Sequence, residues 1–336
     1  MIVLKTGREL KIMREACRIS AGALQTAGMA VEPGVTTAEI NKLAEDYIRS
    51  QGGEPNFLNY EGYPATACIS INNEVIHGIP SKQRKLKAGD IVSIDLGAKF
   101  EGYHGDNAAT FACGDISDEA KRLMDTTKES LYEGIAAAVS GGRIGDIGNA
   151  VQRYVEARGY SVVRQFVGHG VGTHLHEAPE VPNFGTAGRG IRLLPGMTLA
   201  IEPMVNAGLP DVKVMPDGWT VKTKDGSLSA HFEHTVVITS DGPKIMTLLY
   251  GEVMIGQIVS SKAGRDKNYF MVVVKEDDGY IYVCDGKERP LERPKRKNAK
   301  HLRFTNTVLG VDSFKTNKSL RKAIAVFKDR SLKEEP

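Results

Sequence analysis

Apolar residues recur at helical spacing in four segments of the chain, and two of these segments follow a turn that contains glycine. The pattern predicts helices over 7–28, 36–51, 118–139 and 144–158. Segments rich in Ile, Val and Thr predict strands over 90–96, 107–112, 197–202 and 232–239. Helical and strand segments alternate in blocks with short hairpins. This order is typical of an α+β fold in which helices pack on one face of a sheet.

The sequence contains an internal repeat that becomes visible when the chain is slid by 107 residues. Two separated pairs of segments coincide at this offset: 86–96 with 193–203, and 34–52 with 141–159. The same offset places Asp95 on Glu202. Coincident amphipathic patterns are the alternative, but one constant offset across two segments favours a duplicated helix-plus-strand unit. We therefore expect both halves to contribute to a site between them.

Length and composition are those of a water-soluble globular protein with one large and one small domain. The chain has 336 residues, of which 41% are hydrophobic and 25% are charged. No stretch approaches the ~18 consecutive apolar residues of a membrane span, and the charged N-terminal segment lacks an apolar signal region. The four cysteines are widely spaced and predict reduced thiols: Cys17, Cys68, Cys113 and Cys284. We expect a cytoplasmic monomer.

Charge is distributed unevenly along the chain. From Tyr250 to the end there are 19 of the 44 basic residues and 12 of the 41 acidic ones, a net charge of +7. The preceding part therefore carries −4, within an overall net charge of +3. An acidic module is thus followed by a basic one, and the basic module is the candidate for a polyanionic partner.

Four carboxylates and one imidazole stand out because each lies in a distinctive local setting: Asp95, Asp106, His169, Glu202 and Glu233. Carboxylates gathered at one site repel each other and take up protons unless positive charge lies between them. Two divalent metal cations would supply that charge, and oxygen-rich ligation with one imidazole suits Co, Mn, Fe or Zn. A pair about 3.5–4 Å apart can generate hydroxide and stabilise a tetrahedral intermediate. The sequence therefore predicts a dinuclear metallohydrolase.

The interval between Asp95 and Asp106 is odd, so a single strand would direct the two side chains to opposite faces. The letters "KFEG" lie midway between them and can turn the chain. We therefore expect a hairpin in which the two residues are directly opposite each other and share a face. The alternative, a solvated Asp on each strand, is disfavoured because "SID" is flanked by apolar residues.

Several motifs carry a family resemblance: "YEGYPATACISINNEVIHGIP", "IDLGAKFEGYHGD", "GHGVGTHLHEAP", "IEPM" and "DGWTVKTKDGSLSAHFEHTVV". On these motifs, residues 1–248 resemble a type I methionine aminopeptidase of the simple bacterial form. The resemblance implies a pita-bread fold, a pseudo-twofold curved antiparallel sheet with outer helices. It also implies co-translational removal of the initiator Met from nascent proteins whose second residue is small.

The resemblance assigns roles to individual residues. It makes Asp95, Asp106, His169, Glu202 and Glu233 the ligands of the metal pair. It implies that Glu202 moves the proton of the attacking water, and that two imidazoles contact the substrate: His77 and His176. The pocket for the Met side chain would be lined by Tyr60, Tyr63, Cys68 and Trp219, with Phe57 and Leu175 at its edge.

Other histidines compete for these roles or fall outside them. His174 lies two residues from His176 and is an alternative for its assignment. His104 and His231 are expected to lie behind the ligands or on the surface, and His231 departs from the Gln that is usual in the family. His234 follows Glu233 directly and must face the other side of that strand, where a structural hydrogen bond is expected.

Two other readings of the peptidase region stay open. A Xaa-Pro dipeptidase has the same pita-bread fold and the same ligand set, but normally carries an additional N-terminal domain and lacks this pattern of Tyr and Trp. A non-catalytic RNA- or ribosome-binding relative of the fold belongs to a different functional class. Such relatives lose metal ligands, whereas this sequence retains all five.

The basic part of the chain changes character. Residues 251–310 have short alternating strands, which predict a small all-β barrel. "GQIVSSKAGRDKNYFMVVV" resembles a KOW-type SH3-like domain of the kind found in ribosomal proteins. The candidate RNA contacts are Lys295, Arg296, Lys297, Lys300 and Arg303, with Tyr269 and Phe304 nearby. A solvated basic loop is the alternative to ribosomal RNA binding. Residues 311–336 form a basic tail in which "SLRKAIAVFKDR" predicts a short helix.

Overall fold

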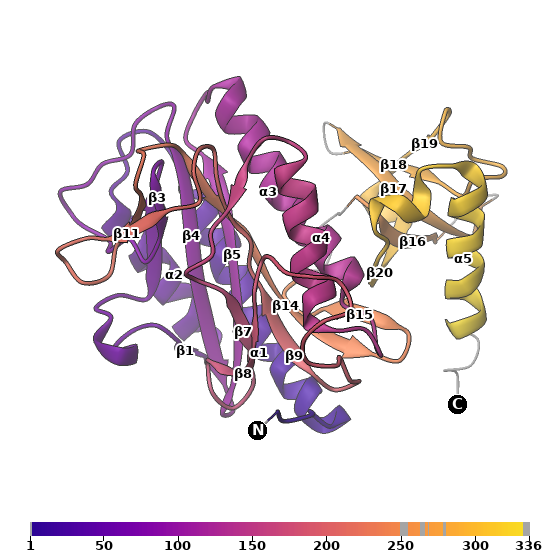
Figure 1. Cartoon of the computed structure of the whole chain (residues 1–336), viewed down its shortest axis with the longest axis horizontal. Helices are drawn as coiled ribbons and strands as arrows, with labels where there is room; N and C mark the ends of the chain where they lie inside the picture. The colour runs from indigo at the N-terminus through magenta and orange to yellow at the C-terminus, as the bar shows by residue number, and fades with distance from the viewer. Residues whose placement is uncertain (1, 249–254, 263–265, 268, 278–279, 332–336) are drawn as a thin grey trace.

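The computed structural model describes residues 2–248, 255–262, 266–267, 269–277 and 280–331 (Figure 1). The expected boundary between the two modules, between 248 and 251, lies outside the described residues. All four helices predicted in the first module are present: α1 (Gly7–Met29), α2 (Thr37–Ser50), α3 (Asp118–Ala137) and α4 (Ile144–Glu156). The first two begin at Thr capping boxes, in which Thr6 pairs with Glu9 and Thr36 with Glu39.

A nine-stranded antiparallel sheet forms the centre of the first module. Its order is β1-β4-β5-β14-β9-β7-β8, with β2 on β4 and β15 on β14. The strands are β1 (Glu54–Pro55), β2 (Ala67–Ile71), β4 (Ile91–Phe100), β5 (Tyr103–Ala112), β7 (Gly168–Gly170), β8 (Glu177–Val181), β9 (Thr198–Ile201), β14 (Glu233–Thr239) and β15 (Gly242–Ile245). Two small sheets adjoin it: β13-β10-β6 and β11-β12-β3. Their strands are β3 (Glu74–Ile76), β6 (Ser161–Val162), β10 (Met204–Asn206), β11 (Val212–Val214), β12 (Val221–Thr223) and β13 (Ser229–His231).

The β4–β5 hairpin corrects one expectation. Asp95 pairs with Ala108, and Asp106 pairs with Gly97, so the two aspartates are diagonal neighbours rather than directly opposite. The reason is the turn, which consists of Glu101 and Gly102 alone, at φ 47° and 83°. Two consecutive positive φ values form a type I′ hairpin turn, whose twist matches that of the strands. Because the shift is two residues, both carboxylates still lie on the same face.

The helices cover the face of the sheet that is opposite to the one carrying Asp95 and Asp106. α1 and α2 pack on β4 through apolar residues such as Ile19, Ile48 and Ile94. α3 and α4 pack on β9 and β14 through a separate cluster that includes Leu131 and Ile201. Each half of the chain thus buries its own pair of helices against its own part of the sheet, as the α+β prediction requires.

The internal repeat is confirmed at the level of single hydrogen bonds. The Gly34 amide donates to the Leu86 carbonyl at 2.8 Å, and 107 residues later the Gly141 amide donates to the Leu193 carbonyl at 2.9 Å. Glycines at equivalent positions share a left-handed backbone: φ is 94° and 86° at Gly34 and Gly141. The matched residues therefore make the same turns, and coincident amphipathic patterns do not explain the repeat.

The C-terminal module is a five-stranded antiparallel sheet in the order β19-β18-β17-β16-β20. Its strands are β16 (Gln257–Ser261), β17 (Phe270–Asp277), β18 (Tyr280–Cys284), β19 (Lys295–Asn298) and β20 (Leu302–Val308). The helix expected in the tail is α5 (Asn317–Ser331). Its residues Leu320 and Ile324 pack against Ile258 and Cys284 of the sheet. The helix expected in the tail thus forms part of the core of this module.

The C-terminal module contacts the first one through the end of β20. Figure 1 shows β20 beside β15 and α3. Val308 is 5% exposed and belongs to the same apolar cluster as α3, α4 and β14. Gly310 is also close to α3, because a Cβ added there would lie 3.1 Å from that of Ala136. The two modules thus share a hydrophobic contact. Across the described residues, no helix is both long and apolar enough to cross a bilayer.

Candidate active site

The strand register brings all five predicted ligands to one face of the central sheet. Asp95 lies opposite Ala108, which in turn lies opposite Glu233 on β14. Asp106 is two residues from Ala108 and shares its face. His169 of β7 pairs with Ala200 of β9, and Glu202 follows two positions later on the same side. The five side chains line a single cavity of about 190 Å³.

The geometry of His169 leaves a lone pair directed at carboxylates. Its Nδ1 lies 2.8 Å from the Gly170 carbonyl, which can only accept, so Nδ1 carries the ring proton. The deprotonated Nε2 then lies 3.9 Å from Asp106 Oδ2 and 3.6 Å from Glu202 Oε1. Ligand atoms of Asp106, His169 and Glu233 all lie within 4.8 Å of one another. A lone pair facing carboxylate oxygens at these distances fits a shared cation.

Buried carboxylate oxygens in the cavity have no hydrogen-bond donor among the residues that the structure describes: Asp95 Oδ1, Asp106 Oδ1 and Glu233 Oε1. Burial raises the pKa of Asp95 to about 7. Burial, followed by the charges of neighbouring carboxylates, raises the pKa of Asp106, Glu202 and Glu233 well above the ordinary range. Unpaired buried carboxylates are unfavourable unless they bind protons or cations. The donor set therefore fits divalent metal ions.

An apolar compartment adjoins the carboxylates. Cys68 of β2 lies directly opposite Asp95 of β4, so its side chain is next to the acidic cluster on the same face. Tyr63 and Trp219 meet edge to face, with ring centroids 5.1 Å apart. The Tyr63 hydroxyl donates to the carbonyls of Ala67 and Gly78, which holds its ring in place. Phe57 and Leu175 also line the cavity, and Phe57 packs against the cluster of Tyr63 and Cys68.

The two predicted substrate-contacting imidazoles both reach the cavity. The ring of His176 lies 4.2 Å from that of His169, between centroids, and its Nδ1 lies 2.8 Å from the Tyr60 hydroxyl. His77 has a positive φ of 59°, an uncommon backbone for a non-glycine residue, and its ring meets Trp219 edge to face. Burial lowers the pKa of His77 to about 4 and also lowers that of His176, so both are neutral at pH 7.

The remaining histidines lie in four different environments. The His174 side chain is 81% exposed, so it does not compete with His176 for the cavity. His234 Nδ1 lies 2.9 Å from the Thr247 hydroxyl on the helix-covered face, which confirms the expected structural bond. His104 bonds to the Asn56 side chain. His231 is 1% exposed, and its Nε2 lies 3.8 Å from Glu202 Oε2, so it lies behind that carboxylate rather than on the surface.

Four residues that line the cavity were not predicted from the sequence: Glu61, Ile76, Phe166 and Val167. Phe166 meets His77 edge to face at 5.9 Å between centroids. Ile76 and Glu61 are adjacent to the predicted residues His77 and Tyr60, whereas the other two precede His169 by three and two positions. The three apolar residue types indicate no chemistry because they shape the wall of the cavity, whereas Glu61 is a carboxylate whose charge acts on His176.

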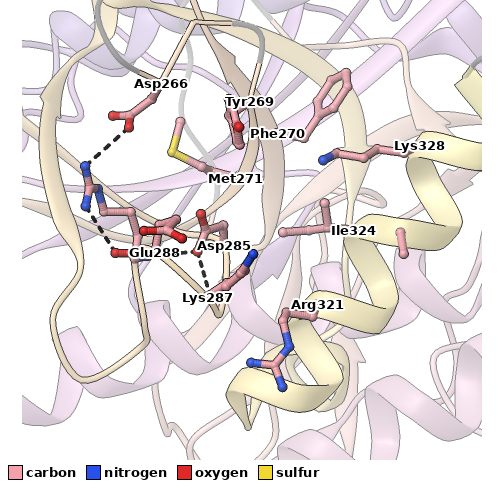
Figure 2. Close-up of a pocket in the computed structure, with 12 residues that line it drawn as sticks. Asp266, Tyr269, Phe270, Met271, Asp285, Lys287, Glu288, Arg321, Ile324 and Lys328 are labelled. Carbon is pink, nitrogen blue, oxygen red and sulfur yellow. Dashed lines mark hydrogen bonds and ion pairs between the residues drawn. The ribbon is translucent and has the colours of Figure 1, made fainter.

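The five predicted RNA contacts do not share one environment. Lys295 and Lys297 bind Asp266, with Nζ–Oδ2 distances of 2.9 and 3.1 Å. Burial raises the pKa of Asp266, but the hydrogen bonds from these lysines outweigh it and lower that pKa to about 2. Figure 2 shows the Asp266 carboxylate at one side of a cavity of about 510 Å³, with Lys328 of α5 on the other. Arg296 and Arg303 are exposed, whereas the Lys300 side chain lies outside the described residues.

Comparisons with known proteins identify the family of the first module. The pattern of metallopeptidase family M24 matches residues 11–240. A methionine aminopeptidase of Clostridium acetobutylicum is 53% identical over 248 residues, which are 74% of this chain and 99% of that protein. The crystal structure of a Thermotoga maritima methionine aminopeptidase superimposes with a TM-score of 0.73 and 43% identity, covering 74% of this chain and all of that one.

A prolidase of Pyrococcus horikoshii matches less well, with a TM-score of 0.59, 25% identity and 64% of its chain covered. These matches describe the first module, whose pita-bread fold they confirm, and they leave the KOW resemblance of the second untested. The chain therefore belongs to metallopeptidase family M24, and it is a hydrolase of the methionine aminopeptidase group within that family.

Proposed function

We propose that the enzyme removes the initiator Met from nascent proteins with a small second residue, and that two divalent cations (Co, Mn, Fe or Zn) serve the reaction. The observation that carries this proposal is the convergence of the five predicted ligands on one cavity beside an apolar compartment. Asp95, Asp106, His169, Glu202 and Glu233 would hold the cations. When bound, the cations would lower the pKa of water towards neutrality and polarise the substrate carbonyl.

Glu202 would accept the proton of the attacking water and return it to the leaving amine. Its carboxylate lies between two imidazoles, 3.6 Å from His169 Nε2 and 3.8 Å from His231 Nε2. A carboxylate in this position is close enough to the reacting groups to accept and return a proton. The neighbouring Glu233 remains available to the cations.

His176 would donate a hydrogen bond to the carbonyl oxygen as negative charge develops there. Burial raises the pKa of the Tyr60 hydroxyl, so it stays protonated and can donate to His176 Nδ1. That bond leaves the proton on His176 Nε2, which suits stabilisation of an oxyanion. His77, neutral and rigidly held against Trp219, would contact the peptide near the scissile amide.

The apolar compartment would take the Met side chain. A flexible thioether packs well against the rings of Tyr63 and Trp219. Because Cys68 is directly opposite Asp95, a side chain in this compartment places its own α-amino group near the carboxylates. Only a residue with a free amino group gains that contact, so the site favours an exopeptidase. Phe57 and Leu175 line the cavity and His231 lies behind Glu202, so these are the positions to test for second-residue preference.

The activity is tested with Met-Ala-Ser and Met-Gly peptides, before and after chelation and with each of the four metals restored. We expect hydrolysis that is lost on chelation and recovered with metal. Asp106→Asn and Glu233→Gln should abolish turnover, whereas Glu119→Gln, at an exposed position of α3, should not. Cleavage of Ala-Pro instead of the Met peptides would favour the dipeptidase, and no cleavage with any metal would favour a binding protein.

We further propose that the C-terminal module binds ribosomal RNA and keeps the enzyme near emerging chains, which would place it in the cytoplasm as a monomer. The net charge of +7 from Tyr250 onward supports a polyanionic partner. Binding of this kind is weak and falls steeply between roughly 50 and 200 mM salt. Co-sedimentation of the full chain with ribosomes across this range tests it, and absence of binding at the lowest salt contradicts it.

A further inference from the structure

One face of the C-terminal sheet carries a row of alternating cationic and aromatic side chains. Lys275 of β17 is directly opposite Tyr282 of β18, and Tyr282 is directly opposite Arg296 of β19. Lys275 Nζ lies 5.3 Å from the centroid of the Tyr282 ring. The Arg296 guanidinium carbon lies 4.1 Å above the ring of Tyr280, two residues along the same strand. Both distances are in the range of cation–π attraction.

The row lies on the part of this face that α5 leaves open. Cys284 shares the face and is fully buried under α5 together with Ile324. Tyr282 and Tyr280 come before it on β18 and are only partly buried. The residues between them, Ile281 and Val283, point to the other face and are buried in a separate cluster. Aromatic rings thus occupy the surface of the sheet, where packing does not require them.

The cation of β19 that belongs to this row has a different environment from the other cations of that strand. Lys295 and Lys297 point to the opposite side of that strand, and both form ion pairs with Asp266. Arg296 lies between them in sequence and is exposed on the aromatic side. The alternation of the strand therefore separates two structural lysines from one arginine that faces solvent and an aromatic ring.

We propose that Lys275, Tyr280, Tyr282 and Arg296 form a surface on which the C-terminal module stacks unpaired RNA bases. This inference rests on the proposed RNA binding and names the residues and the form of RNA. Every base presents a planar face that stacks on an aromatic ring, and adjacent cations attract the phosphates between bases. A duplex conceals its bases within the helix, so it would contact only the cations. An acidic polypeptide such as polyglutamate offers charge but no ring to stack.

The test uses the full chain and a fluorescently labelled, unstructured RNA oligonucleotide at low salt, with a duplex of the same length for comparison. Tyr282→Leu keeps an apolar side chain but removes the ring. It should weaken binding to the single strand about tenfold, as expected for the loss of one stacked base, with little effect on the duplex. Arg296→Gln should weaken binding to the single strand. It should also reduce the salt dependence of that binding by the amount expected for one lost phosphate contact.

Lys121→Gln, an exposed position on α3, is the matched control for the loss of one positive charge and should leave RNA binding unchanged. Retained hydrolysis of Met peptides and an unchanged melting temperature show that each variant is folded; Tyr280→Leu replaces Tyr282→Leu if the latter does not fold. If the parent chain binds RNA but the Tyr and Arg variants bind it equally well, this surface is wrong while the proposed RNA binding stands. If the parent chain binds no RNA, both fail.

If Tyr282→Leu weakened binding to the duplex as much as binding to the single strand, or if polyglutamate displaced the single strand as effectively as unlabelled RNA does, the module would recognise charge alone and the stacking surface would be overturned.

Discussion

Removal of divalent metal should reverse the usual effect of pH on a protein rich in carboxylates. A carboxylate that is paired in the folded state normally contributes stability as pH rises. In the metal-free enzyme, Asp95 instead has its pKa raised by burial from 3.8 to about 7. Its folded form therefore keeps a proton that its unfolded form releases, and rising pH favours unfolding.

The magnitude follows from the width of that interval. One pKa unit corresponds to about 1.4 kcal/mol, so Asp95 accounts for about 4 kcal/mol over its full titration. Between pH 5 and 8 the free energy of unfolding should fall by about 3 kcal/mol from this group alone. Asp106, Glu202 and Glu233 also have raised pKa values and act with the same sign. The loss of stability from Asp95 is complete once the pH exceeds the pKa of its folded form.

Buried histidines act in the opposite direction over part of this range. Burial lowers the pKa of His169 and His231 to about 3, whereas their unfolded value is 6.5. Their contribution to stability is present above pH 6.5 and is lost as the pH falls below it. A single plot of the free energy of unfolding against pH therefore mixes the two trends in the metal-free enzyme, and a matched variant is needed. Asp95→Asn removes the titrating group while retaining its size.

The assay is urea-induced unfolding of the chelated parent and of chelated Asp95→Asn at pH 5, 6, 7 and 8. The stability of the parent relative to the variant should decline across this series by at least about 3 kcal/mol, because the Asp95 charge also raises the pKa values of Asp106, Glu202 and Glu233. Restoring metal should abolish the decline in the parent, because cations replace protons as the partners of the carboxylates. A constant difference between the chelated proteins would refute the reasoning, since it would mean that Asp95 is ionised in the metal-free cavity.

Three further predictions concern other contacts. Tyr60→Phe removes the bond to His176 and should lower kcat about tenfold with little change in KM; an unchanged kcat would show that the bond does not orient the ring. Lys5→Met breaks the buried ion pair with Glu177 and should destabilise the enzyme by about 3 kcal/mol in urea, an effect that Glu177→Gln should partly reverse. Val308→Ala should cost about 2 kcal/mol and lower the temperature at which peptidase activity is lost, and an unchanged temperature would argue against the shared core.

Local patterns predicted the helices and the central strands because each pattern repeats with the period of its element. The side chains expected to bind metal are brought together, although their role as ligands stays a prediction. The predicted register of the β4–β5 hairpin was wrong because the register depends on which two residues form the turn. Glycine readily adopts a positive φ, so Gly102 can be recognised as a turn residue from the sequence. Glu101 cannot, and its φ of 47° shifts the pairing of Asp95.

Long-range partners were beyond the reach of the sequence. Lys295 and Lys297 stand in a run of basic residues that reads as a solvent-facing patch. Their partner, Asp266, precedes them by about 30 residues and approaches them only when β17, β18 and β19 align. The burial of His231 has the same origin, because its environment is formed by strands from both halves of the chain.

The insertion of Val308 into the core of the peptidase has a mechanical consequence. The C-terminal module joins the peptidase through the connecting chain and again through this contact, so it cannot swivel freely as a tethered domain would. An enzyme that is anchored through that module would present its catalytic opening in a fixed direction. Its access to a substrate would then be set by orientation, and lengthening the connection would widen the solid angle that it samples only if the contact at Val308 were also broken.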